Sequence, residues 1–141
     1  MSFASALNVL RPTLPYYLAL TKYGLLRINR DCFEFHPDTK APPIALEKGL
    51  YLASEDILLA HLRAVPDDVA TLLMIAHNDG IWHLAEALAA DGPAAALAAL
   101  REKYPTGALA TLRAPDGPWR DLAWGSAELA AFVRPRDVAA A

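Results

Sequence analysis

The residues best placed to do chemistry form a short polar turn, HNDG at positions 77–80. The turn follows an apolar run at 72–76 and precedes a helical pattern that begins at Ile81. An apolar run closed by a turn and followed by a helix predicts one buried strand, one loop and one helix. In open α/β sheets, ligands bind at the carboxyl ends of the strands, and His77 falls at such an end.

An imidazole in this place supports several kinds of chemistry. It can bind a phosphoryl group, donate a proton or ligate a metal ion. The amides of the following turn and helix N-terminus carry partial positive charge, which suits an anion. The plainer alternative is a strand-end histidine that is hydrogen-bonded to the backbone. The spacing of His77, Asp79 and His83 matches no metal-binding motif.

The remaining polar side chains point to less specific roles. His83 is expected to be packed or solvent-facing on its helix, and His61 to lie on the polar side of the preceding helix. Arg134 and Arg136 are expected at a solvated strand end, with contact to phosphate or protein as the alternative. Cys32 has no matched partner pattern that would make it a nucleophile.

Turn signals and apolar periodicity predict the elements that position His77. Ser54, followed by two acids, begins a helix whose buried face is expected to carry Ile57, Leu58, Leu62 and Val65. The expected elements are, in order, a strand or extended segment at 44–51, a helix from 55 to about 65, a strand at 71–76, helices at 81–90 and 94–103, and strands at 108–113 and within 128–133. This order predicts an α/β sandwich.

The two ends of the chain have a different character. The first 43 residues carry no sustained period, although 16–23 predicts a short helix and 33–35 a short strand. The tail after Pro135 is expected to be mobile.

Length and composition exclude several classes of protein. A chain of 141 residues fits one domain with a sizeable core. The net charge of −3, without a basic run, argues against a nucleic-acid partner. No apolar run approaches the roughly 20 residues that span a bilayer, and no charged and apolar N-terminal signal is present, so no membrane partner is expected. The single cysteine, Cys32, predicts a reducing, cytoplasmic location.

Several motifs in order resemble the histidine phosphatase superfamily, and in particular its small phosphohistidine phosphatases of the SixA type. The stretch LLMIAHNDGIWHLAEALA is similar to the second-histidine motif of that group, LLLVGHNPGLxELAxxL. The segments 46–73, 103–112 and 119–137 also resemble the family in the right order. The resemblance covers residues 44–137, with 1–43 as a divergent or replaced N-terminal segment and 138–141 as a tail.

The resemblance implies a fold and a reaction. The fold is a three-layer-like α/β sandwich of the phosphoglycerate mutase type, and its N-terminal part is incomplete or replaced here. The reaction is hydrolysis of phosphohistidine or of a phosphomonoester, without a metal or other cofactor. In the family an arginine-histidine pair ends the first strand and supplies the nucleophile, and a second arginine joins the phosphate pocket. His77 matches the second histidine, which contacts phosphoryl oxygens, and Asn78 and Gly80 are weaker candidates for phosphate binding.

The chain also departs from the family pattern. It contains no Arg-His dipeptide, and Arg27 and Arg30 lack the flanking residues of the second arginine. Ala76 replaces the usual glycine, and Asp79 places a carboxylate beside the expected anion site. We therefore expect a catalytically impaired domain whose partner is phosphate or a phosphorylated small molecule or protein. The alternative is a non-enzymatic anion-binding or protein-interaction module, with a homodimer through an unpaired sheet edge as one form.

Overall fold

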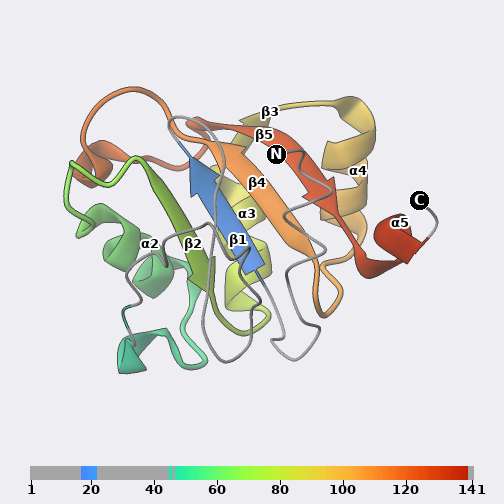
Figure 1. The fold of residues 1–141 in the computed structure, drawn as a ribbon, viewed down its shortest axis with the longest axis horizontal. Coiled ribbons are helices and arrows are strands. Elements are labelled where there is room, and N and C mark those ends of the chain that lie inside the picture. The colour runs from blue at the N-terminus through green and yellow to red at the C-terminus, as the bar shows by residue number, and fades with distance from the viewer. Residues whose placement is uncertain (1–16, 22–44, 46, 140–141) are drawn as a thin grey trace, which may run out of the picture.

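The computed structural model of the chain describes residues 17–21, 45 and 47–139, which form a mixed α/β fold (Figure 1). The α/β class is therefore as expected. The elements are β1 (Tyr17–Thr21), η1 (Lys48–Leu50), α2 (Glu55–Arg63), β2 (Thr71–Ile75), α3 (Gly80–Leu88), β3 (Ala89–Asp91), α4 (Ala94–Glu102), β4 (Leu109–Arg113), η2 (Trp119–Asp121), β5 (Ala127–Val133) and α5 (Pro135–Ala139).

Five strands within these residues form one mixed sheet in the order β2-β1-β4-β5-β3. β1 lies between β2 and β4, antiparallel to the first and parallel to the second. β5 is antiparallel to β4 and parallel to β3. The register pairs Ile75 with Tyr17, Tyr17 with Leu109, and Leu109 with Val133. The carboxyl ends of β2 and β5 therefore lie at the same edge of the sheet.

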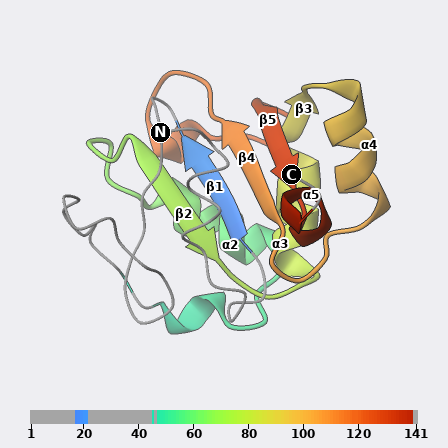
Figure 2. The same cartoon turned by 45° about the vertical axis from the view of Figure 1, so that its right-hand side comes forward.

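Three helices cover one face of this sheet. In Figure 1 α3 lies behind the strands, with α2 on the side of β2 and α4 on the side of β5, and in the turned view of Figure 2 α2 and α3 both lie behind the sheet. α3 contacts α2 on one side and α4 on the other. The indole N–H of Trp82 donates to the carbonyl of Leu100 at 2.7 Å and ties α3 to α4. The described residues thus build a sheet layer and a helical layer, while the finer three-layer architecture stays a prediction.

Alternate residues of the strands face the core between these layers, and this alternation is interrupted once, in β5. Ala110 and Leu112 of β4 point into the core, as alternate residues of a strand should. On β5 the core residues are Ala127 and Leu129, and then Phe132. The spacing changes because the ladder shifts by one residue between the pairs 111–131 and 112–129. A bulge of this kind moves the following side chains to the opposite face.

Most of the predicted elements are confirmed, with ends that differ by a residue or two. The helix predicted at 16–23 is wrong, because Tyr17–Thr21 form β1. This segment fills the space between β2 and β4, where pairing on both sides outweighs local preference. The strand β3 was not predicted, and it continues directly from the end of α3. The predicted strand at 33–35 lies outside the described residues, as do Arg27, Arg30 and Cys32.

Two further predictions are corrected. The segment 44–51 contains the short helix η1 in place of a strand, and Gly49 there packs against the ring of His61. The described part of the tail, Pro135–Ala139, forms α5. The Asp137 carboxylate accepts a hydrogen bond from the Arg134 backbone N–H at 2.8 Å, which resembles a capping box and holds the first turn.

The buried face of α2 is shifted from the predicted one. Leu58, Leu59 and Leu62 are buried, whereas Ile57 keeps 47% of its surface exposed. The face that meets α3 therefore includes Leu59 and excludes Ile57. No helix in the described part of the chain has the length and apolar character needed to cross a bilayer.

Candidate functional site

His77 lies where the sequence predicts, two residues beyond the end of β2 and three before α3. The chain turns tightly here, because the His77 carbonyl accepts a hydrogen bond from the Ile81 N–H at 3.1 Å. The Asp79 carbonyl accepts one from the His83 N–H at 3.0 Å. The strand, the loop and the helix are thus one continuous unit that fixes the backbone of His77.

The imidazole of His77 is half-buried, and its two nitrogens are not equivalent. Nδ1 is buried and has no hydrogen-bond partner among the described residues. The alternative prediction, a histidine whose ring is hydrogen-bonded to the backbone, is thus not seen at Nδ1. The ring of Tyr51 meets the His77 ring edge-on, with centroids 5.1 Å apart and an interplanar angle of 81°. Because a buried N–H without an acceptor is costly, the tautomer with its proton on Nε2 fits these surroundings better than the one with its proton on Nδ1. That tautomer offers one N–H donor.

Asn78 is held by the segment that connects α4 to β4. Its side-chain NH₂ donates to the Tyr104 carbonyl at 3.0 Å, while its Oδ1 is buried without a partner among the described residues. Tyr104 is itself buried, and its hydroxyl accepts a hydrogen bond from the Ala110 N–H at 3.2 Å. Burial raises the pKa of Tyr104. The contacts of Asn78 thus secure the turn against the core.

Gly80 has a packing role that needs no ligand. A Cβ at this position would collide with the carbonyl oxygen of Ala53 and lie 3.3 Å from the Cδ1 of Leu58. Glycine therefore allows α3 to approach the loop that leads into α2.

The charges around this turn are mainly negative. Asp79 is exposed, and Glu55 at the start of α2 lies 3.6 Å from Nδ1 of His83. Neither a hydrogen bond nor an ion pair joins His77 or Asn78 to an arginine or lysine within the described ranges. Within the described ranges, no cationic side chain is thus held beside the His77 imidazole by a hydrogen bond or an ion pair.

The direction of β1 separates its carboxyl end from His77. Tyr17, the first residue of β1, pairs with Ile75 beside the histidine turn, whereas Thr21 pairs with Thr71 at the start of β2. Four residues of strand separate these ends by about 13 Å. A group placed at the end of β1, where the family has its nucleophile, would thus lie at the opposite edge of the sheet.

Arg134 and Arg136 leave the same sheet edge as His77, but from β5. Because β1 and β4 lie between β2 and β5, the two ends are three strand spacings apart, which is about 14 Å. His77 and these arginines therefore leave the sheet from strands that are not adjacent.

The other histidines are placed by structural contacts. His61 Nδ1 donates to the Ile57 carbonyl at 2.9 Å, so this ring is more than a plain surface group. His83 is exposed on α3, as one of the two expectations had it. Across the described part of the chain no three His, Cys, Asp or Glu residues gather into a metal-binding group.

Sequence reasoning missed Tyr51, Glu55 and Tyr104 as neighbours of the turn. Each comes from another element, and only the packing of α2 and of the α4–β4 connection brings it near. No spacing signal in the sequence marks these contacts.

Curated relatives are found in mycobacteria. An uncharacterized protein of Mycobacterium leprae is 35% identical over 95 residues, which is 67% of this chain and 58% of that protein. An uncharacterized protein of Mycobacterium tuberculosis is 37% identical over 103 residues, which is 72% of this chain and 64% of that protein. The chain thus spans about three-fifths of the length of these relatives. No protein-family profile matches the chain. No solved structure matches it either.

Proposed function

We propose that this chain carries a SixA-like histidine phosphatase domain that is catalytically impaired and that contacts a phosphoryl group through His77 without turning it over. The order of the resembling motifs over 44–137 supports the domain type. Two observations support the impairment. No described arginine or lysine makes a hydrogen bond or an ion pair with His77, and the end of β1 lies at the far edge of the sheet.

The chemistry explains why these surroundings matter. A histidine nucleophile divides hydrolysis into two easier steps, and a single histidine cannot both attack phosphorus and hold the phosphoryl oxygens. Cationic donors stabilise the negative charge of the transferred group, and losing one such donor typically costs about 10²–10³ in rate. Loss of one member of a concerted group costs several powers of ten. His77 alone therefore supports weak binding and no measurable turnover.

The proposed architecture and location follow from the same reasoning. We propose the three-layer-like sandwich of the phosphoglycerate mutase type, with β1 in the central place of the missing family strand. We propose a cytoplasmic location on the single cysteine.

The experiment compares the native chain with His77→Ala and with a matched control, His83→Ala, which changes a histidine on the adjacent helix α3. p-Nitrophenyl phosphate and a phosphohistidine-containing protein serve as substrates. We expect no turnover by any of the three proteins. Turnover by the native chain that is abolished by His77→Ala and kept by His83→Ala would overturn the proposed impairment.

Binding is measured separately by titrating inorganic phosphate and following the ring signals of both histidines by NMR. We expect the His77 signals to shift and the His83 signals to stay. If neither histidine responds, His77 is not a phosphoryl contact and that part of the proposal fails.

A second candidate function is a protein-interaction module, and exposed apolar side chains beside His77 favour it. Tyr51 and Leu52 keep 70% and 64% of their surface exposed, and Leu52 adopts a positive φ of 51° that is uncommon for a bulky residue. β2 is also the last strand on its side of the described sheet, so a homodimer through that edge belongs to this candidate. Sedimentation of the native chain over a concentration range tests it, because a chain that stays monomeric excludes the homodimer.

A further inference from the structure

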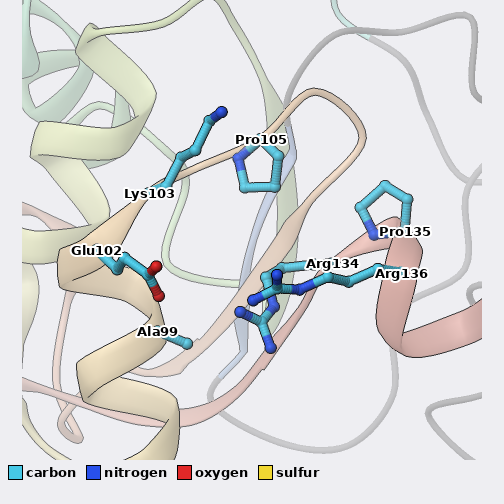
Figure 3. Close-up of a pocket in the computed structure, with 7 residues that line it drawn as sticks. All are labelled: Ala99, Glu102, Lys103, Pro105, Arg134, Pro135 and Arg136. Atoms are coloured by element: carbon cyan, nitrogen blue, oxygen red, sulfur yellow. The ribbon is translucent and has the colours of Figure 1, made fainter. Parts of the chain in front are cut away.

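A pocket separate from the histidine turn lies where α4, the segment after it and the end of β5 meet. Its volume is about 260 Å³ (Figure 3). It is lined by Ala99, Glu102, Lys103, Pro105, Arg134, Pro135 and Arg136. This volume is just below the roughly 300 Å³ at which typical ligand pockets begin, so any occupant is a small molecule.

Arg134 is held in this pocket by Asp137, which uses only part of the hydrogen-bonding capacity of its guanidinium group. Its Nε donates to Oδ2 of Asp137 at 2.9 Å, and its Nη2 donates to Oδ1 at 3.0 Å. The hydrogen bonds to Asp137 raise the pKa of Arg134, and the Glu102 carboxylate acts in the same direction. A guanidinium has five N–H donors in a rigid fork, so the edge away from Asp137 still presents Nη1 and one Nη2 hydrogen. That edge matches the geometry of a carboxylate.

Three other charged residues line the pocket. Glu102, Lys103 and Arg136 are exposed, and none makes an ion pair or side-chain hydrogen bond within the described part of the chain. In Figure 3 the Glu102 carboxylate and the Arg136 guanidinium point toward the middle of the pocket, whereas Lys103 extends away from it. The pocket therefore offers positive groups on one side and a carboxylate on the other.

The remaining lining is apolar, and the helix end adds to the negative side. Ala99, Pro105 and Pro135 contribute only carbon atoms from their side chains. α4 ends at Glu102, and a helix C-terminus carries partial negative charge that suits a cation. A ligand that carries only negative charge would meet Glu102 and the end of α4 unfavourably.

We propose that this pocket binds a free α-amino acid as its zwitterion. The carboxylate lies on the open edge of Arg134 and beside Arg136, the ammonium group faces Glu102 and the end of α4, and a small apolar side chain lies against the two prolines. This inference does not depend on the function proposed for His77.

The test is a titration of the full chain with L-valine, followed by backbone amide NMR. Isovalerate, isobutylamine and inorganic phosphate serve as the carboxylate-only, amine-only and anion-only probes. We expect saturable shifts at the pocket residues with L-valine and at least tenfold weaker binding of the other three, since each lacks one charge-assisted set of hydrogen bonds. Absence of a saturable response to L-valine overturns the proposal, and so does equal or tighter binding of phosphate.

Variants then assign the binding to these side chains. Arg136→Gln and Glu102→Gln should each weaken L-valine binding about tenfold. Arg101→Gln is the matched control, because Arg101 is an exposed arginine of α4 that does not line the pocket. His77→Ala should also bind L-valine normally, which keeps this result distinct from the phosphate experiments. If Arg136→Gln or Glu102→Gln binds L-valine as tightly as the native chain, the proposed position of L-valine in this pocket is wrong.

Discussion

Replacing Gly80 by alanine tests the approach of α3 to the loop before α2. In an open helix position this change would stabilise the protein by about 0.5–1 kcal/mol, because alanine is a better helix former. Here the new Cβ meets the backbone carbonyl of Ala53, which cannot rotate away as a flexible side chain would. Overpacking of this kind typically costs about 1–3 kcal/mol. We therefore expect Gly80→Ala to destabilise the fold by up to about 2.5 kcal/mol after the propensity gain.

Urea unfolding of the native chain and of the variant measures this difference through the midpoint at constant m. Ala87→Gly is the control, because Ala87 is exposed on the same helix and reports the propensity cost alone. We expect both Gly80→Ala and Ala87→Gly to lower the free energy of unfolding, although one introduces an alanine and the other a glycine. A stabilising Gly80→Ala would refute the close contact between α3 and Ala53.

Three further predictions concern the core and the C-terminal helix. Trp119→Ala should cost about 3–5 kcal/mol in urea unfolding, because this buried indole packs in the core and donates to the Val69 carbonyl at 2.8 Å. Tyr104→Phe should cost about 1–3 kcal/mol in the same assay, because it leaves the buried Ala110 N–H without its acceptor. Hydrogen bonds from Arg134 hold the pKa of Asp137 below the ordinary value of 3.8, so this pair stabilises α5 above that pH and the stabilisation is lost as pH falls through the lowered value. An acid titration of the α5 amide signals should show this loss in the native chain and not in Asp137→Asn.

The sequence alone predicts an element correctly where the signals for that element lie within its own residues. The strand 71–76 and the helix that follows it were predicted because an apolar run, a turn and a helical period are all local signals. The place of His77 followed from them. The side-chain surroundings of His77 did not, because Tyr51 and Tyr104 reach the turn from distant parts of the chain.

The wrong secondary-structure predictions concern strands that depend on pairing with distant strands, and elements too short to show a sequence pattern. β1 forms a strand because it has neighbours on both sides, and nothing within 17–21 announces those partners. α5 has only five residues, and a side-chain cap at Asp137 decides its first turn. The bulge in β5 changes which alternate residues face the core, so a strict period of two assigns Ala131 where the core holds Phe132.

The phosphoryl contact proposed at His77 and the amino-acid site proposed at Arg134 lie along the same edge of the sheet but have different charged neighbours. β2 and β5 end at this edge, and the first leads to His77 and the exposed Asp79 while the second leads to Arg134 and Arg136. The segment at Tyr104 lies between them, since its carbonyl holds Asn78 and the next residue, Pro105, lines the pocket. Among the described residues, no hydrogen bond or ion pair links His77 to those arginines. Those cations instead face Glu102, and that pairing of opposite charges favours a zwitterion over a phosphate.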